Sequence, residues 1–210
     1  SHFKAETWKS HVETMRKAGI EEWYIESCHK IKYMFPKAHA AAYVISAFRI
    51  AWYKVHKPIV YYATYFSCRF TDFDIETMIK GYDEIKKKML EIQAKGYEAT
   101  NKDTSALETL KLALEMTARG FKFGNLDIEK SDAVNFVIDE DNKTLIPPFR
   151  TLDGLGDSVA NQIIKEREEK PFYSIEDFAN RGKVNASTME KLRSLGIFGN
   201  RSEEHTSELQ

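Results

Sequence analysis

Two closely spaced glycines near the C-terminal end constrain the local fold more than any other feature of the sequence. Residues 151–169 read "TLDGLGDSVANQIIKEREE", in which Gly154 and Gly156 lie on either side of Leu155. Glycine adopts backbone conformations that other residues avoid, so this spacing predicts a tight turn. Apolar residues recur at helical spacing after the turn, which predicts that a helix begins immediately behind it.

This stretch has the form of a helix-hairpin-helix. Leu155 is expected to point inward and hold the hairpin, and Ala160 to keep the two helices close. The hairpin N–H groups would then point outward at a helix N-terminus, which favours an anion such as a DNA phosphate. Because peptide N–H groups contact phosphates and not base edges, such binding is independent of base sequence. The alternative is an ordinary glycine turn. The predicted DNA-binding residues are Gly154, Leu155, Gly156, Lys165 and Arg167.

The next stretch, "SIEDFANRGKVNASTMEKLRSLGIF", is similar to a second, degenerate hairpin between two helices. Its glycine pattern is incomplete, so we expect it to pack on the first hairpin and to serve the structure. Its expected contribution to the shared core consists of Phe178, Met189, Leu192, Leu195 and Ile197.

A second feature is the distribution of charge. The chain has a formal net charge of −1, yet no Asp or Glu occurs from Ser27 to Thr71, where seven Lys or Arg and three His are found. Local patches of charge, and not the total, set the field that a polyanion meets. The stretch is therefore either a surface for a polyanion or a solvated basic face.

Composition excludes several classes of protein. With 42% hydrophobic residues in 210, the chain can bury one or two cores. Two cysteines cannot form a disulfide framework and indicate a reducing compartment. The most apolar stretch, Ala38 to Tyr53, is short for a bilayer and contains Arg49, so we expect a cytoplasmic protein without a membrane span. A zinc site is not expected, because no C-x₂-C or H-x₃-H pair occurs among Cys28, His29, His39, His56 and Cys68.

Hydrophobic periodicity predicts a mainly α fold. Residues 6–33 are expected to be helical with a break at Gly19, and Pro36 and Pro58 are each expected near the start of a further helix. One amphipathic helix is predicted over residues 72–96.

The next helix is predicted to begin with a capping box formed by Ser105 and Glu108 and to end at Gly120. Between Asp127 and Phe149 two strand-like runs flank a turn, which predicts a small β hairpin.

The order of these pieces resembles the C-type bacterial replicative DNA polymerases, the alpha subunits of DNA polymerase III. The segments that carry the resemblance are "KIKYMFPKAHAAAYV", "VHKPIVYYATYFSCRFTDFD", "LIPPF" and the GLG hairpin, and it runs from about residue 8 to about residue 200. In that family the first of these segments, which contains "FPKAHAAAY", belongs to the fingers, which close on the incoming nucleotide. The resemblance implies that Lys37 and His39 lie near the triphosphate and that Tyr43 shapes the pocket. The residues alone also fit a surface lysine at a helix start and a partly buried histidine.

The resemblance also implies a domain organisation. Residues 1–71 correspond to the C-terminal part of the fingers, and residues 72–150 to a helical segment with a small β hairpin in the duplex-binding region. Residues 151–200 form the helix-hairpin-helix DNA-binding unit. Residues 201–210, "RSEEHTSELQ", are the direct translation of a common sequencing-adapter read and are expected to be an artefact. The absence of Met at Ser1 fits an incomplete reading frame.

The function implied by the resemblance is that of a segment of a DNA-directed DNA polymerase. Its Mg²⁺ would be bound by palm aspartates outside this chain, so we expect no catalytic or metal-binding residue here and no activity of the segment alone. Asp74, in "DFD", is predicted to be a helix N-cap. The implied partners are primer-template DNA, deoxynucleoside triphosphates and, through a peptide missing here, the sliding clamp. The alternative is a stand-alone helix-hairpin-helix DNA-binding or scaffold module without an enzymatic parent.

Overall fold

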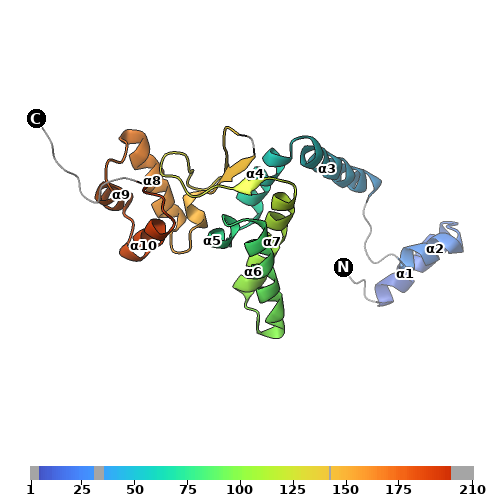
Figure 1. The fold of residues 1–210 in the computed structure, drawn as a ribbon. Helices are drawn as coiled ribbons and strands as arrows, with labels where there is room; N and C mark the ends of the chain where they lie inside the picture. The colour runs from blue at the N-terminus through green and yellow to red at the C-terminus, as the bar shows by residue number, and fades with distance from the viewer. Residues whose placement is uncertain (1–4, 31–35, 142, 200–210) are drawn as a thin grey trace, which may run out of the picture. The chain divides into compact units, whose positions relative to one another are not determined.

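The computed structural model describes residues 5–30, 36–141 and 143–199, so the expected artefact at residues 201–210 lies outside them. The chain divides into two compact units, one of residues up to Arg49 and one from Ile50 onward. Helices dominate, and the second unit also holds a small three-stranded sheet (Figure 1). The predicted fold class, mainly α with a small β hairpin, is confirmed. The domain boundaries at residues 71/72 and 150/151 stay predictions.

The first unit begins with two helices, α1 (Ala5–Lys17) and α2 (Glu22–Lys30). Gly19 lies between them with a φ of 77°, a conformation that favours glycine, and the helix breaks there as expected. The rings of Trp8 and His29 contact each other across the pair, with centroids 5.2 Å apart.

The long helix α3 (Lys37–His56) buries none of its residues. The carbonyl of Pro36 accepts the hydrogen bond of the Ala40 N–H at 3.1 Å, so the proline stands directly ahead of the first helical residue. Large apolar side chains on α3 are more than half exposed in most cases: Tyr43, Val44, Ile45, Phe48, Ile50, Trp52, Tyr53 and Val55.

The helices of the second unit follow in the order α4 (Pro58–Arg69), α5 (Ile75–Met78), α6 (Tyr82–Ala94) and α7 (Asn101–Ala118). A single 3₁₀ turn (Gly96–Glu98) connects α6 to α7, and these two helices lie side by side (Figure 1).

The single helix predicted over residues 72–96 is wrong, because Gly81 has a φ of 92° and separates α5 from α6. The expected apolar stripe is nevertheless mostly inward: Ile75, Met78 and Ile85 are buried, while Tyr82 beside the break is exposed.

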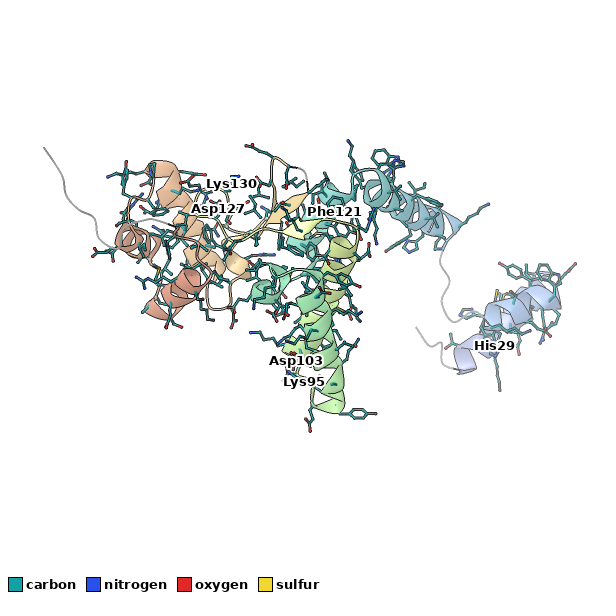
Figure 2. The ribbon with its side chains drawn as sticks, viewed as in Figure 1. His29, Lys95, Asp103, Phe121, Asp127 and Lys130 are labelled. Carbon is teal, nitrogen blue, oxygen red and sulfur yellow. The ribbon has the colours of Figure 1, made fainter. Side chains whose placement is uncertain are left out.

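The N-cap of helix α7 lies five residues before the predicted cap. It is Thr100, whose hydroxyl accepts from the Asp103 N–H at 3.1 Å while Asp103 accepts from the Thr100 N–H at 2.9 Å. Lys95 also donates to Asp103 at 2.7 Å (Figure 2). This lysine bond and the bonds from Thr100 lower the pKa of Asp103 to about 2. The prediction of a capping box at Ser105 was therefore wrong. The predicted end of the helix at Gly120 agrees with the structure, where Gly120 has a φ of 85°.

A polar network inside the second unit joins the end of α3 to α4 and α7. The Tyr62 side chain is fully buried, and its hydroxyl donates to Glu115 at 2.7 Å and accepts from Arg119 at 3.0 Å. Lys54 forms an ion pair with Glu115 at 2.8 Å, and Arg119 also donates to the Lys54 carbonyl at 3.1 Å. Burial, and then the hydrogen bond to Glu115, raise the pKa of Tyr62 to about 12.

The sheet has the strand order β1-β3-β2, with β1 at Lys122–Phe123, β2 at Val137–Ile138 and β3 at Thr144–Ile146. Strands β2 and β3 form the predicted antiparallel hairpin, in which Val137 pairs with Ile146. Strand β1 was not predicted; it is two residues long and pairs with β3 in parallel.

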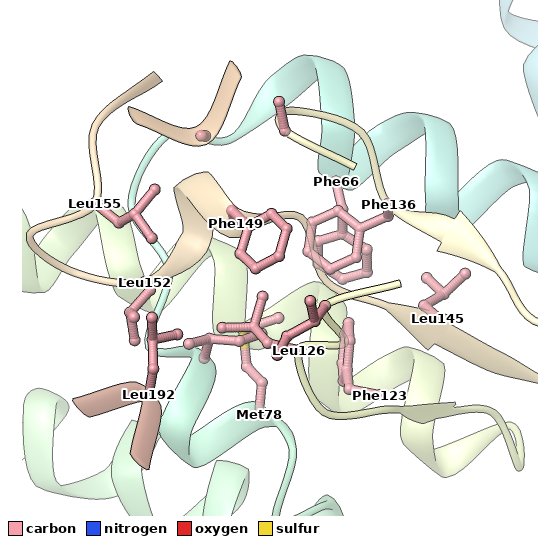
Figure 3. Close-up of a cluster of buried hydrophobic side chains, with 14 of the residues drawn as sticks. Phe66, Met78, Phe123, Leu126, Phe136, Leu145, Phe149, Leu152, Leu155 and Leu192 are labelled. Carbon is pink, nitrogen blue, oxygen red and sulfur yellow. The ribbon is translucent and has the colours of Figure 1, made fainter. Parts of the chain in front are cut away.

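The C-terminal part contains a 3₁₀ turn at Phe149–Thr151 and three helices, α8 (Asp157–Glu169), α9 (Ile175–Gly182) and α10 (Ala186–Ser194). One hydrophobic cluster runs from α4 through the sheet into these helices. Phe66 of α4 contacts Phe123 and Phe136, while Leu152, Leu155 and Leu192 extend the cluster toward the C-terminal helices (Figure 3). The C-terminal helices therefore share their core with the segment that precedes them.

Among the residues that the structure describes, no helix is both long and apolar enough to cross a membrane.

Candidate nucleic-acid interface

The turn between Leu152 and α8 has the geometry expected of a helix-hairpin-helix. Gly154 has a φ of 96°, and Leu155 is only 3% exposed, so the turn is fixed from inside by its central leucine. Gly156 is the N-cap of α8, and no side chain caps this end. Apart from Gly156 itself and its two chain neighbours, no residue has a heavy atom within 4 Å of the place that a Cβ on Gly156 would occupy. The first N–H groups of α8 therefore have no side-chain cap, and the exposed Asp157 is the acid of the first turn.

Close packing of α8 on α9 fixes the orientation of α8 and therefore of its uncapped N-terminus. Ala160 is fully buried, as expected, and Gly182 of α9 lies against Ile163. A Cβ on Gly182 would be 3.0 Å from Ile163 Cγ1 and 3.3 Å from Val184 Cγ2. A side chain at this position would require Ile163 or Val184 to shift, so glycine suits this close approach of the two helices.

The second hairpin repeats the first at the level of the backbone. Lys183 stands in the left-handed region (φ 53°) where the first hairpin has Gly154, and Val184 is buried as Leu155 is. The N-caps have nearly the same backbone angles, φ −72° and ψ 159° for Asn185 against −76° and 163° in the first hairpin. Unlike the first hairpin, the second is capped by its own side chain, because Asn185 accepts from the Thr188 N–H at 2.8 Å. Its expected structural role stays a prediction.

Three arginines hold the hairpins by donating to main-chain carbonyls. Arg150 donates to the carbonyls of Ser67 and Phe70 at 3.0 and 3.3 Å, at the end of α4. Arg181 donates to the carbonyl of Lys170 at 2.8 Å and forms an ion pair with Glu166 at 3.2 Å.

Arg167, a predicted DNA-binding residue, is the third of these. Its Nη1 donates to the carbonyls of Ile128 and Ser131 at 2.9 and 2.8 Å, and burial lowers its pKa. The other predicted cation, Lys165, is exposed on α8 and lies 3.9 Å from Glu169. The predicted DNA contacts of both residues stay predictions.

Two lysines that sequence reasoning missed lie beside the hairpin. Lys102 of α7 forms an ion pair with Asp153 at 3.0 Å, and Lys191 of α10 donates to the Asp153 carbonyl at 2.8 Å. A groove beside the turn is lined by Asp72, Phe73, Lys102, Arg150 and residues 151–156. No local motif could have found these lysines, because they lie 51 and 38 residues from Asp153 in the sequence.

The residues expected near a triphosphate lie on α3. Lys37, His39 and Tyr43 are all exposed, and the rings of His39 and Tyr43 lie edge to face with centroids 4.5 Å apart. Helix geometry thus brings the two rings together, one turn apart.

The carboxylates of "DFD" have structural partners. Asp74 is the N-cap of α5 and accepts from the Thr77 N–H at 3.2 Å, as predicted. Asp72 accepts from Ser105 at 2.6 Å, and its carbonyl accepts from Thr109 at 2.8 Å. In the described ranges no three His, Cys, Asp or Glu side chains are grouped to hold a metal ion.

These features define a helix-hairpin-helix unit in the C-terminal part of the chain, and a family model described as "Helix-hairpin-helix motif" matches residues 120–207. The chain is also similar to proteins named DNA polymerase III PolC-type. It is 51% identical over 193 residues to that of Lactococcus lactis subsp. lactis, 50% over 197 to that of Streptococcus sanguinis and 49% over 197 to that of Streptococcus pyogenes. These alignments cover 92–93% of this chain, and the chain spans only 12–13% of the length of these relatives. The resemblance to C-type replicative polymerases is thereby confirmed.

Proposed function

We propose that this chain is a segment of a replicative DNA-directed DNA polymerase and supplies a grip on duplex DNA that does not depend on base sequence. The observation that carries the proposal is the open N-terminus of α8 behind a hairpin whose leucine is buried and whose N-cap is glycine. The similarity to polymerases of the PolC type supports it. The relatives named above offer no support for the stand-alone module.

The chemistry of the grip follows from the backbone. N–H groups at the start of a helix carry partial positive charge and donate hydrogen bonds to a phosphate oxygen without reading the base. A polymerase that moves along its template needs contacts of this kind, because every base sequence must be held equally well.

The remaining parts of the proposal concern the whole polymerase. Lys37, His39 and Tyr43 would contact the incoming nucleotide, and Mg²⁺ would be held by carboxylates outside this chain and would stabilise the charge of phosphoryl transfer. The segment alone would then be inactive. We also propose the sliding clamp as a partner of the whole protein, and a cytoplasmic location.

The test of the grip is fluorescence anisotropy of the 210-residue chain with labelled duplex DNA at several salt concentrations. Gly156→Glu places a carboxylate in open space at the hairpin and should weaken binding about tenfold or more, because it repels the phosphate. Gln93→Glu adds the same charge at an exposed position of α6 and should leave the affinity nearly unchanged. Absence of binding by a folded wild-type chain at low salt, or equal affinity of both variants, would refute the grip.

The nucleotide role requires the full-length polymerase. Lys37→Gln should raise KM for nucleotides or lower kcat, whereas Lys57→Gln, which removes another exposed lysine from the acid-free stretch, should change neither. Identical kinetics of the two variants would contradict the role of Lys37.

A further inference from the structure

The hairpin carries an acid where a phosphate-binding site would be expected to carry none. Asp153 directly precedes Gly154, and its side chain is 71% exposed. A carboxylate in this place repels a polyanion unless its charge is neutralised. The groups that neutralise the Asp153 carboxylate therefore decide whether this hairpin can bind a phosphate.

Two lysines from distant helices meet at this acid. The Nζ of Lys102 lies 3.0 Å from Asp153 Oδ1, and the Nζ of Lys191 lies 3.7 Å from Oδ2 and 2.8 Å from the Asp153 carbonyl oxygen. Both lysine side chains are accessible, being 66% and 36% exposed. The three groups carry a net charge of +1 and lie beside the turn that precedes the uncapped N-terminus of α8.

Helix α10 also orients the hairpin backbone. Thr188 lies one turn before Lys191, and its hydroxyl donates to the Gly154 carbonyl at 3.4 Å, while Lys191 donates to the carbonyl of the residue before. Acceptors of the turn are thus satisfied from the α10 side. The donors at the start of α8, in contrast, have no side-chain cap.

We propose that Lys102 and Lys191 are DNA-phosphate ligands and that Asp153 holds them beside the hairpin until a phosphate takes the place of its carboxylate. This inference rests on the proposed DNA grip and extends it to α7 and α10. Exposed ion pairs contribute little net free energy, so a phosphate of the duplex can replace the carboxylate. Lysine binds phosphate as a point charge and needs no fixed geometry, which suits such an exchange.

The exchange predicts opposite effects of the acid and its bases. Asp153→Asn should raise the affinity for duplex DNA several-fold at low salt. Lys102→Gln and Lys191→Gln should each lower it about threefold to tenfold and reduce the slope of log K against log salt by about 0.9. In a chain with both lysines replaced, Asp153→Asn should have a smaller effect, because the lysines it would release are gone.

The matched control is the exposed ion pair of Lys111 with Glu108, which lies on α7 as Lys102 does. Lys111→Gln changes the net charge as the two lysine variants do, and Glu108→Gln changes it as Asp153→Asn does. Each control should leave the affinity and the salt slope within about twofold of wild type. Lys102→Arg and Lys191→Arg keep the charge and should restore most of the binding, which separates the loss of a cation from a loosened hairpin.

The outcomes distinguish the inference from the grip itself. If Gly156→Glu abolishes binding while Lys102→Gln and Lys191→Gln bind as Lys111→Gln does, the lysines are not ligands and only this inference is overturned. If Asp153→Asn lowers the affinity of a folded chain, the exchange is refuted. If the wild-type chain does not bind, the grip and the inference are both overturned.

Discussion

Replacing Gly182 by alanine tests whether the close approach of α8 and α9 is required for stability. Two effects of opposite sign compete at this site. Alanine is a better helix former than glycine by about 1 kcal/mol, and Gly182 has an ordinary helical backbone. Against this, the new methyl would lie 3.0 Å from Ile163 Cγ1, inside a fully buried contact. Overpacking of this kind costs about 1–3 kcal/mol, so we expect a net loss of about 1 kcal/mol.

The assay is thermal unfolding followed by far-UV circular dichroism. A loss of about 1 kcal/mol lowers the Tm by about 2–4 °C in a chain of this size. Gly156→Ala is the control for packing, because the same methyl meets no packing neighbour within 4 Å there, and any change in Tm reflects only the poorer N-cap preference of alanine. Pairing Gly182→Ala with Ile163→Ala should give a loss smaller than the sum of the two single losses, since the cavity receives the methyl. A rise in Tm for Gly182→Ala alone would refute the packing argument.

Two substitutions, followed by chemical or thermal unfolding, and one pH dependence test other parts of the structure. Tyr62→Phe removes a buried hydroxyl that donates to Glu115 and should cost about 1.5–3 kcal/mol, whereas a change within 0.5 kcal/mol would show that the bond contributes little. Lys183→Gly relieves a left-handed backbone and should stabilise by about 0.5–1 kcal/mol; a loss of stability would contradict the strain. The Asp103 carboxylate, whose folded pKa of about 2 lies below its unfolded value, stabilises the fold above about pH 4, and this contribution should fade as the pH falls toward 2. An NMR titration of the Asp103 carboxyl with a midpoint near 4 would contradict it.

Much of the fold could be predicted from local sequence signals. The GLG turn, the buried Leu155 and the end of α7 at Gly120 each depend on residues within a few positions of one another. The hairpin of β2 and β3 also has a local signal, because a turn-rich segment separates two apolar runs.

Local signals failed where two candidates compete. The apolar stripe continues across Gly81 at helical spacing, so periodicity alone could not reveal that the helix stops there. Thr100 and Ser105 are both plausible caps; Asp103 decides between them, because it accepts from the Thr100 N–H and the Lys95 side chain together.

The candidate site was predicted only in part, because its charges come from distant segments. The hairpin itself has a sequence signature, but Lys102 and Lys191 meet Asp153 only after α7 and α10 have packed on the same core. Conversely, Arg167 has the charge expected of a phosphate ligand, and its carbonyl partners at residues 128 and 131 are visible only in the fold.

Those arginine contacts have a consequence for how the chain responds to ionic strength. The guanidinium groups of Arg150 and Arg167 are held by carbonyl oxygens, and dissolved ions weaken such hydrogen bonds far less than they weaken attraction between exposed charges. Counterions compete directly for DNA phosphates, so the proposed duplex binding should fall steeply with salt. If the chain binds duplex DNA as proposed, its folding and its binding should therefore respond differently to salt: concentrated salt should release the DNA while the hairpins stay formed.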